Sequence, residues 1–187
     1  MIRAAPVPQS HLFFAVFVPP ELHAPLEAAQ APVKTGWKLT PAPQLHVTLA
    51  FLGEAKVIEM KTLLELGRAL SSTLKPFTAT LRGTGFFPLD GSPRVWFLKA
   101  EAPEFHALAT TLQTSLELQS DFKFHPHVTL ARKKDRGPKP PTLSLNLEFE
   151  VSQFALVRSF LERGGSRFKT LEKFFLASPA PPPALHE

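Results

Sequence analysis

The five residues His-Val-Thr-Leu-Ala occur twice in this chain, at positions 46–50 and again at 127–131. The side chains of a β-strand alternate between its two faces, so in each copy the histidine and threonine share one face and the valine and leucine the other. Polar side chains are costly to bury unless partners or a ligand satisfy them. The repeat therefore predicts a cleft where two histidines and two threonines converge on one anion: His46, Thr48, His127 and Thr129. The alternative is two half-buried strands that share a pattern without sharing a function.

The composition narrows the class of protein. A chain of 187 residues is long enough for one domain with its own core, and the absence of cysteine excludes disulfides, thiolate nucleophiles and Cys-ligated zinc. The net charge of +5 favours a polyanionic partner, with nucleic acid the first candidate. The chain has no apolar run that could span a bilayer and no secretory signal, so we expect a cytoplasmic monomer that does not bind membranes.

Proline marks the ends of the folded region. Several of the 20 prolines cluster at 179–183, near the end of the chain. We therefore predict a flexible leader at 1–10, a single two-lobed domain at 11–177 and a disordered Pro-rich tail at 178–187.

The hydrophobic periodicity of the domain predicts a mixture of strands and helices. Strands are expected at 11–18, 45–52 (ended by Gly53), 77–83, 94–99, 122–131, 147–158 and 167–176. Helices are expected at 20–33, 57–74 and 103–118, and Pro-rich loops at 36–44 and 132–141. The order strand, helix, motif strand in 11–52 is repeated in 94–131, which predicts two lobes with the motif strands side by side near a pseudo-two-fold axis.

Paired His-x-Thr-x motifs about eighty residues apart resemble those of the two-histidine phosphoesterase superfamily. The sequence that flanks the motifs resembles the LigT-like branch of this superfamily, which comprises RNA 2′,3′-cyclic phosphodiesterases that were first named 2′–5′ RNA ligases. The matching stretches are LFFAVFVP near the start, LHVTLAFLG at 45–53, GTGFFP at 83–88, PRVWFL at 93–98, PHVTLAR at 126–132 and the closing segment 154–176. One departure is that Phe168 stands where the family often has a tyrosine.

The resemblance implies an α+β fold with two lobes, in which antiparallel sheets line a central cleft and helices pack outside. It implies a metal-independent enzyme without a cofactor, which opens a terminal 2′,3′-cyclic phosphate on RNA and leaves a 2′-phosphate. By analogy with the superfamily, His127 is the general base and His46 the general acid, although the sequence itself does not distinguish them.

The residue types suit this chemistry. One group must deprotonate water and another must protonate the departing ribose oxygen, and histidine does both because its pKa of about 6.5 lies near neutral pH. The hydroxyls of Thr48 and Thr129 can donate to the non-bridging phosphate oxygens. Arg132 follows the second motif and is a candidate phosphate clamp. Its odd spacing from Thr129 would turn it away on a regular strand, so the strand must end or bend there.

Four aromatic residues are candidates to stack on the terminal base: Phe51, Phe124, Trp37 and Phe168. With 17 phenylalanines in the chain, each of these is individually more typical of core packing.

Two other functions stay open at this level. One is a 2′–5′ RNA ligase or RNA-end-binding protein, since ligation is the same reaction run backwards with a ribose hydroxyl in place of water. The other is a metal-dependent phosphodiesterase that uses His125 and His127, although no acidic cluster follows them.

Overall fold

A computed structural model describes residues 10–54, 60–118, 123–162 and 165–177. The predicted tail and all but the last residue of the predicted leader lie outside these ranges, as do residues 57–59 and 122 of predicted elements. The described strands are β1 (Ser10–Phe17), β2 (Trp37–Leu39), β3 (His46–Glu54), β4 (Phe77–Phe87), β5 (Val95–Glu101), β6 (His127–Lys133), β7 (Asn146–Val151), β8 (Gln153–Glu162) and β9 (Gly165–Phe175). The helices are α1 (His23–Gln30), α2 (Met60–Thr73) and α3 (Pro103–Ser115), with short 3-10 turns at Pro20–Leu22 (η1) and Ala42–Gln44 (η2).

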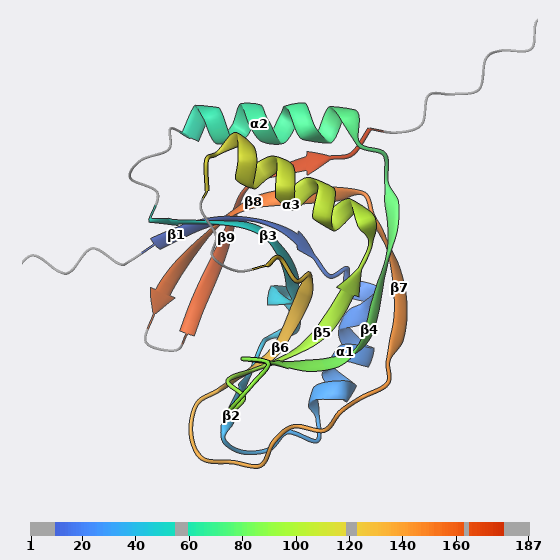
Figure 1. Cartoon of the computed structure of the whole chain (residues 1–187), viewed down its shortest axis with the longest axis vertical. Helices are drawn as coiled ribbons and strands as arrows, with labels where there is room; N and C mark the ends of the chain where they lie inside the picture. Colours follow the sequence, from blue (N-terminus) through green and yellow to red (C-terminus); the bar gives the residue numbers. More distant parts are fainter. Residues whose placement is uncertain (1–9, 55–59, 119–122, 163–164, 178–187) are drawn as a thin grey trace, which may run out of the picture.

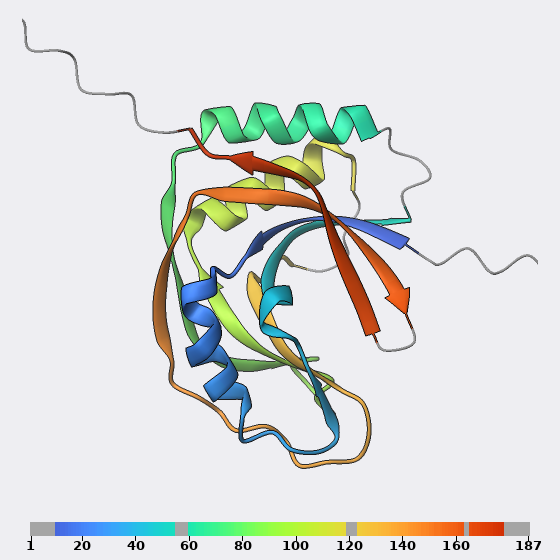
Figure 2. The same ribbon diagram turned by 180° about the vertical axis from the view of Figure 1, so that it is seen from behind.

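All nine described strands belong to one antiparallel sheet in the order β7-β4-β5-β6-β3-β1-β8-β9, with β2 added beside β6. The sheet curls strongly, so that one face is concave (Figures 1 and 2). The two motif strands are neighbours, and within the described residues they pair at Val47 and Val128 alone. This narrow junction separates a first lobe (β3, β1, β8, β9) from a second lobe (β6, β5, β4, β7, β2). The predicted α+β class is confirmed, and the two expected sheets are halves of one curled sheet.

Helices α2 and α3 cover the convex side of the first lobe (Figure 1). Helix α3 packs against β3, and α2 packs against β8 and β9. Alternation along β1 explains the packing, because Leu12, Phe14 and Val16 are buried in the main core. Phe13 and Ala15 face the concave side, in a smaller apolar cluster with Ala155 and Val157. None of the helices in the described ranges has both the length and the apolar character needed to cross a bilayer.

Close approach between α2 and the sheet depends on a glycine. A Cβ atom at Gly67 would overlap the ring of Phe174, which is buried in the same core. Phe174 in turn contacts Phe14 and Phe154, with ring centroids 6.1 and 5.1 Å apart. The ring of Phe174 therefore occupies the space that a side chain at position 67 would fill, and α2 can lie close to the sheet.

One buried polar residue, Gln30, connects helix α1 to the second lobe. Gln30 is 3% exposed, and its Nε2 donates to the carbonyl oxygens of Leu130 (2.8 Å) and Thr40 (2.9 Å). The amide thus ties α1 to the motif strand β6, and these two bonds offset the cost of burying it.

Several sequence predictions of boundaries were wrong. The strand expected at 147–158 is two strands, because the chain passes from the second lobe to the first at Ser152 and β7 and β8 pair with different neighbours. The loop expected at 36–44 contains β2, which pairs with β6. Gly53 does not end its strand, since β3 continues to Glu54 with Gly53 at a φ of 65°. Likewise β6 begins only at His127 and extends to Lys133, into the predicted loop.

Candidate active site

Both motif strands carry a β-bulge at the Leu-Ala step of the repeated pentapeptide. In β3, Ala15 pairs with Thr48 and Phe14 with Ala50, which leaves Leu49 without a partner on β1. In β6, Phe97 pairs with Thr129 and Trp96 with Ala131, which leaves Leu130 without a partner on β5. Both residues of each step are fully or almost fully buried. The extra residue of a bulge reverses the side-chain alternation of the strand. The residue after the Leu-Ala step, Phe51 in β3 and Arg132 in β6, therefore lies on the same face as the histidine and the threonine.

The junction between the lobes gathers the four motif side chains. Val47 and Val128 are fully buried and lie opposite each other in an antiparallel pair. Their neighbours therefore project to the other, concave face, with His46 opposite Thr129 and Thr48 opposite His127. A cleft of about 470 Å³ is lined by all four and by Arg132. The structure thus brings the two distant segments together as the repeat predicted.

The two imidazole rings are held in the same way. His46 Nδ1 lies 2.6 Å from the carbonyl oxygen of Gln44, and His127 Nδ1 lies 2.7 Å from that of His125. A carbonyl oxygen can only accept, so Nδ1 donates in both the neutral and the charged ring. In the neutral rings Nε2 is then the acceptor and is left for a ligand in the cleft.

Aromatic side chains pack around both rings and contribute to their partial burial. Phe13, Phe17 and Phe168 lie around His46, with ring centroids 5.2, 5.6 and 5.3 Å from the imidazole. His127 lies against Phe87 and Phe97, at 5.0 and 5.2 Å.

Burial controls the protonation of both histidines. The pKa of His46 is lowered from 6.5 to about 4. Desolvation is the largest cause, the hydrogen bond to Gln44 opposes it, and the charges of His127 and Arg132 act in the same direction as desolvation. Desolvation also lowers the pKa of His127, with the charge of Arg132 acting in the same direction. Both rings are therefore neutral in the free protein at pH 7.

Arg132 reaches the cleft because of the bulge. Arg132 is three residues after Thr129, and the bulge at Leu130 places both side chains on the same face of β6. This is the irregularity that the sequence analysis required for Arg132 to reach the phosphate. Arg132 lines the cleft, and its charge acts on both histidines. Phe51 occupies the corresponding position in β3 and is 58% exposed, but it does not line the cleft.

Of the other stacking candidates, only Phe168 lies in the cleft. Its ring stands edge-on to His46, at 82° between the ring planes. Trp37 was a wrong prediction: it is 8% exposed in the core, where its Nε1 donates to the carbonyl oxygen of Pro138. Phe124 was also wrong, because it packs edge-on against His106 of α3 and the main core.

Sequence reasoning missed the walls of the cleft. The aromatic neighbours of the histidines look like ordinary core residues, because apolar runs such as that of β1 do not reveal which residues face the concave side. Lys38 of β2 also lines the cleft, close to Gly165 of β9. Gln44 Nε2 donates to the carbonyl oxygen of Ser166, 3.0 Å away. These contacts connect the β8–β9 hairpin with β2 and with η2.

Within the described residues, no three His, Asp or Glu side chains gather into a group that could hold a metal ion. His125 is exposed and contributes its carbonyl oxygen to the positioning of His127.

Comparison with known proteins places the chain in a family. The family model of the 2′-5′ RNA ligase superfamily matches residues 15–160. The RNA 2′,3′-cyclic phosphodiesterase of Thermus thermophilus is 46% identical over 177 residues, covering 88% of this chain and 89% of the relative. That of Escherichia coli is 31% identical over 173 residues, covering 88% and 96%.

Solved structures agree with this assignment. A crystal structure of a protein from Thermus thermophilus superposes with a TM-score of 0.84 at 47% identity, covering 89% of this chain and 97% of that one. Escherichia coli LigT, crystallised with 3′-AMP, superposes with a TM-score of 0.76 at 30% identity, covering 91% and 99%. The chain therefore belongs to the 2′-5′ RNA ligase superfamily, within its branch of LigT-like RNA 2′,3′-cyclic phosphodiesterases.

Proposed function

We propose that this protein opens the terminal 2′,3′-cyclic phosphate of RNA by general acid–base catalysis between two histidines and leaves a 2′-phosphomonoester. Water attacks phosphorus, the bond from phosphorus to the 3′ oxygen breaks, and a 2′-phosphate and a free 3′-hydroxyl result. His127 Nε2 takes a proton from the attacking water, and His46 Nε2 gives one to the departing 3′ oxygen. The roles of the two histidines follow the analogy with the superfamily.

The other cleft residues bind the phosphate in this proposal. The hydroxyls of Thr48 and Thr129 donate to the non-bridging oxygens, which places phosphorus between the imidazoles. The guanidinium of Arg132 neutralises charge that develops on the phosphate in the transition state. The arrangement is supported by the five residues lining one cleft.

The enzyme must gain one proton before the reaction can occur. Both imidazoles are neutral at pH 7, because burial lowers their pKa values, yet the acid must carry a proton. A phosphodiester anion bound between the rings raises the pKa of both, since it favours their charged forms. We therefore expect the complex to take up one proton from solvent. The pH profile of kcat/KM should then be bell-shaped, with its maximum below pH 6.5 and apparent pKa values that belong to the pair.

The observation that carries this proposal is the matched pair of Nδ1 hydrogen bonds, which leaves two Nε2 atoms available in a single cleft. Nucleotide binding by Escherichia coli LigT, crystallised with 3′-AMP, is consistent with it.

The test is to incubate the protein with 2′,3′-cyclic AMP in excess chelator and to identify the product. Release of 2′-AMP supports the proposal. Release of 3′-AMP contradicts the assigned direction of opening, and inhibition by chelator indicates a metal-dependent reaction. A joined 2′–5′ product when an RNA with a 5′-hydroxyl is added, without hydrolysis, favours the ligase.

A further inference from the structure

A second cavity adjoins the catalytic cleft on the concave side of the first lobe. It has a volume of about 520 Å³ and shares Gln44, Arg167 and Phe168 with the cleft. Phe17, whose ring contacts His46, forms part of its wall. Phe17 thus contacts the imidazole of His46 and also lines the second cavity, so the two cavities adjoin.

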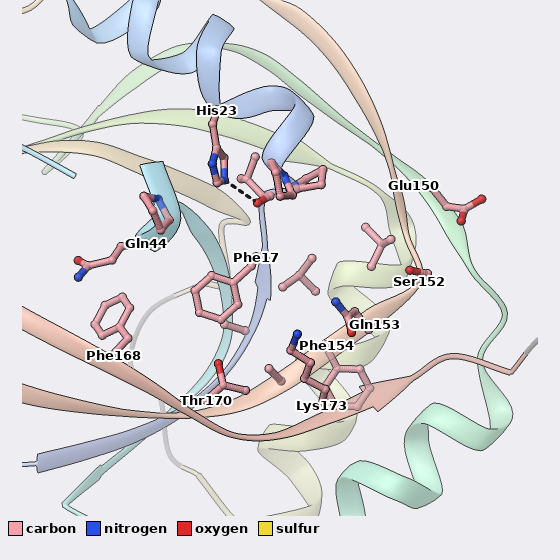
Figure 3. Close-up of a pocket in the computed structure, with 18 of the residues that line it drawn as sticks. Phe17, His23, Gln44, Glu150, Ser152, Gln153, Phe154, Phe168, Thr170 and Lys173 are labelled. Carbon is pink, nitrogen blue, oxygen red and sulfur yellow. Dashed lines mark hydrogen bonds between the residues drawn. The ribbon is translucent and has the colours of Figure 1, made fainter. Parts of the chain in front are cut away.

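The cavity combines flat apolar surfaces with a few polar groups, as Figure 3 shows. Phe17 and three prolines (Pro19, Pro20 and Pro43) supply the apolar part. Among the polar lining residues, Gln153, Thr170 and Lys173 supply an amide, a hydroxyl and an ammonium group from β8 and β9. The other polar lining residues are His23, Gln44, Glu150, Ser152 and Arg167. A volume of several hundred Å³ with apolar walls and a small number of polar groups is typical of a site for a small organic ligand.

A third bulge places the lysine in this cavity. Thr170 pairs with Val157 and Glu172 with Leu156, so Leu171 has no partner on β8. The bulge brings Lys173 to the face of Phe168 and Thr170, although its spacing of five from Phe168 is odd. The structure gives Lys173 no ion pair among the described residues, and the Nζ atom points into the cavity in Figure 3.

Gln153 is the second polar group that supports a ligand in this cavity. Its Oε1 is buried and has no hydrogen-bond partner in the described part of the chain. A buried amide oxygen without a partner is costly, and a half-turn of the amide exchanges this acceptor for the two N–H donors. Such an amide is suited to the polar edge of a nucleobase, which carries both donors and acceptors.

We propose that this cavity binds the nucleotide that precedes the cyclic end of the RNA. In this arrangement the terminal phosphate lies between His46 and His127, Lys173 pairs with the phosphodiester on the 5′ side, and Gln153 contacts the preceding base. The cation favours an anionic linkage, and the apolar wall favours a planar base. The inference rests on the proposed function, because it assumes that the cleft holds the cyclic phosphate.

The test compares kcat/KM for 2′,3′-cyclic AMP with that for the dinucleotide ApA carrying a 2′,3′-cyclic phosphate. We expect the dinucleotide to be preferred about tenfold, as the product of two contacts that each contribute about threefold. Lys173→Ala and Gln153→Ala should each reduce this preference about threefold. Lys169→Ala is the matched control, because it removes the same charge from the same strand, and Lys169 lines neither cavity.

Equal kcat/KM for the two substrates in the wild type would overturn the subsite, as would equal effects of Lys173→Ala and Lys169→Ala on the preference. If neither substrate turns over, the proposed function fails separately. The subsite is then tested by the binding of ApA with a terminal 2′-phosphate to the wild type and to Lys173→Ala. Binding of the dinucleotide no tighter than that of 2′-AMP would overturn it, whereas tighter binding that depends on Lys173 supports it.

Discussion

The two motif strands share five residues and one bulge, but the bulge delivers different side chains to the concave face. In β6 it places Arg132 in the cleft, and in β3 it places Phe51 beside His11, with ring centroids 5.5 Å apart. The repeated part therefore supplies two proton carriers and two hydroxyls in near-symmetric positions. The residue just after it breaks the symmetry, since only the second lobe adds a charge.

The surroundings of the two histidines differ in the same way. Three phenylalanines surround His46, whereas His127 has two and lies next to the exposed His125. Identical residues on pseudo-equivalent strands thus acquire different environments from segments outside the repeat.

The largest effect is expected from removing either imidazole. His46→Ala and His127→Ala should each lower kcat for a 2′,3′-cyclic nucleotide by about 10³-fold, because each deletes one proton transfer. His125→Ala, which changes an exposed histidine two residues from the motif, is the control. Steady-state kinetics of the three variants, with circular dichroism to verify folding, provides the measurement. Near-wild-type activity in either motif variant would eliminate the two-histidine mechanism.

The next effect is on stability, and it follows from the pKa of His46. That pKa is lowered from 6.5 to about 4 in the folded state, so above pH 6.5 the ring is neutral in both states and contributes nothing to the pH dependence. As the pH falls from 6.5 to 4, the unfolded chain binds a proton that the folded chain does not, and the free energy of unfolding falls by up to about 3 kcal/mol. Below pH 4 this dependence ends.

Urea unfolding at about pH 7, 5.5 and 4.5 measures this loss, and His46→Asn should reduce it. His127 contributes in the same direction, because burial lowers its pKa as well. His125→Asn serves as the exposed control. Parallel pH dependence in the wild type and His46→Asn would contradict the burial of an uncharged imidazole at this position.

The asymmetry of the bulges gives the third prediction. Arg132→Ala should lower kcat/KM about thirtyfold, because a charge-assisted contact to phosphate contributes about 2 kcal/mol. The optimum pH should also rise, since the charge of Arg132 lowers the pKa of both histidines. Phe51→Ala, at the corresponding position in β3, should change kcat/KM less and leave the optimum where it is. A similar change in both variants would mean that the bulges do not distinguish the two lobes.

The sequence predicted the four motif side chains on one face, because a strand alternates with a period of two whatever surrounds it. It did not predict the bulges, which depend on pairing with β1 and β5 and on the hydrogen bond from Gln30 to the Leu130 carbonyl, 100 residues away. The position of Arg132 consequently followed from the resemblance, and a regular strand would have turned it away. Trp37 was a candidate to stack on a base because it is aromatic, and the sequence does not show that its Nε1 donates to the carbonyl oxygen of Pro138, 101 residues away.

The smallest effect tests the symmetry of phosphate binding itself. Thr48→Val and Thr129→Val each remove one hydroxyl that donates to a non-bridging oxygen. Each should lower kcat/KM about fivefold to tenfold, which is the contribution of one hydrogen bond from an uncharged donor. Thr→Ser at the same positions keeps the hydroxyl and is the matched control. The register places Thr48 opposite His127 and Thr129 opposite His46, so each hydroxyl lies next to the imidazole of the other lobe.

Equal losses in the two threonine variants, combined additively in the double variant, would mean that phosphorus lies midway between the lobes and that the motif alone determines its position. A larger loss for Thr129→Val would mean that Arg132 draws the phosphate toward β6. Rate measurements on these variants therefore show whether the asymmetry of the bulges extends to the binding of the phosphate.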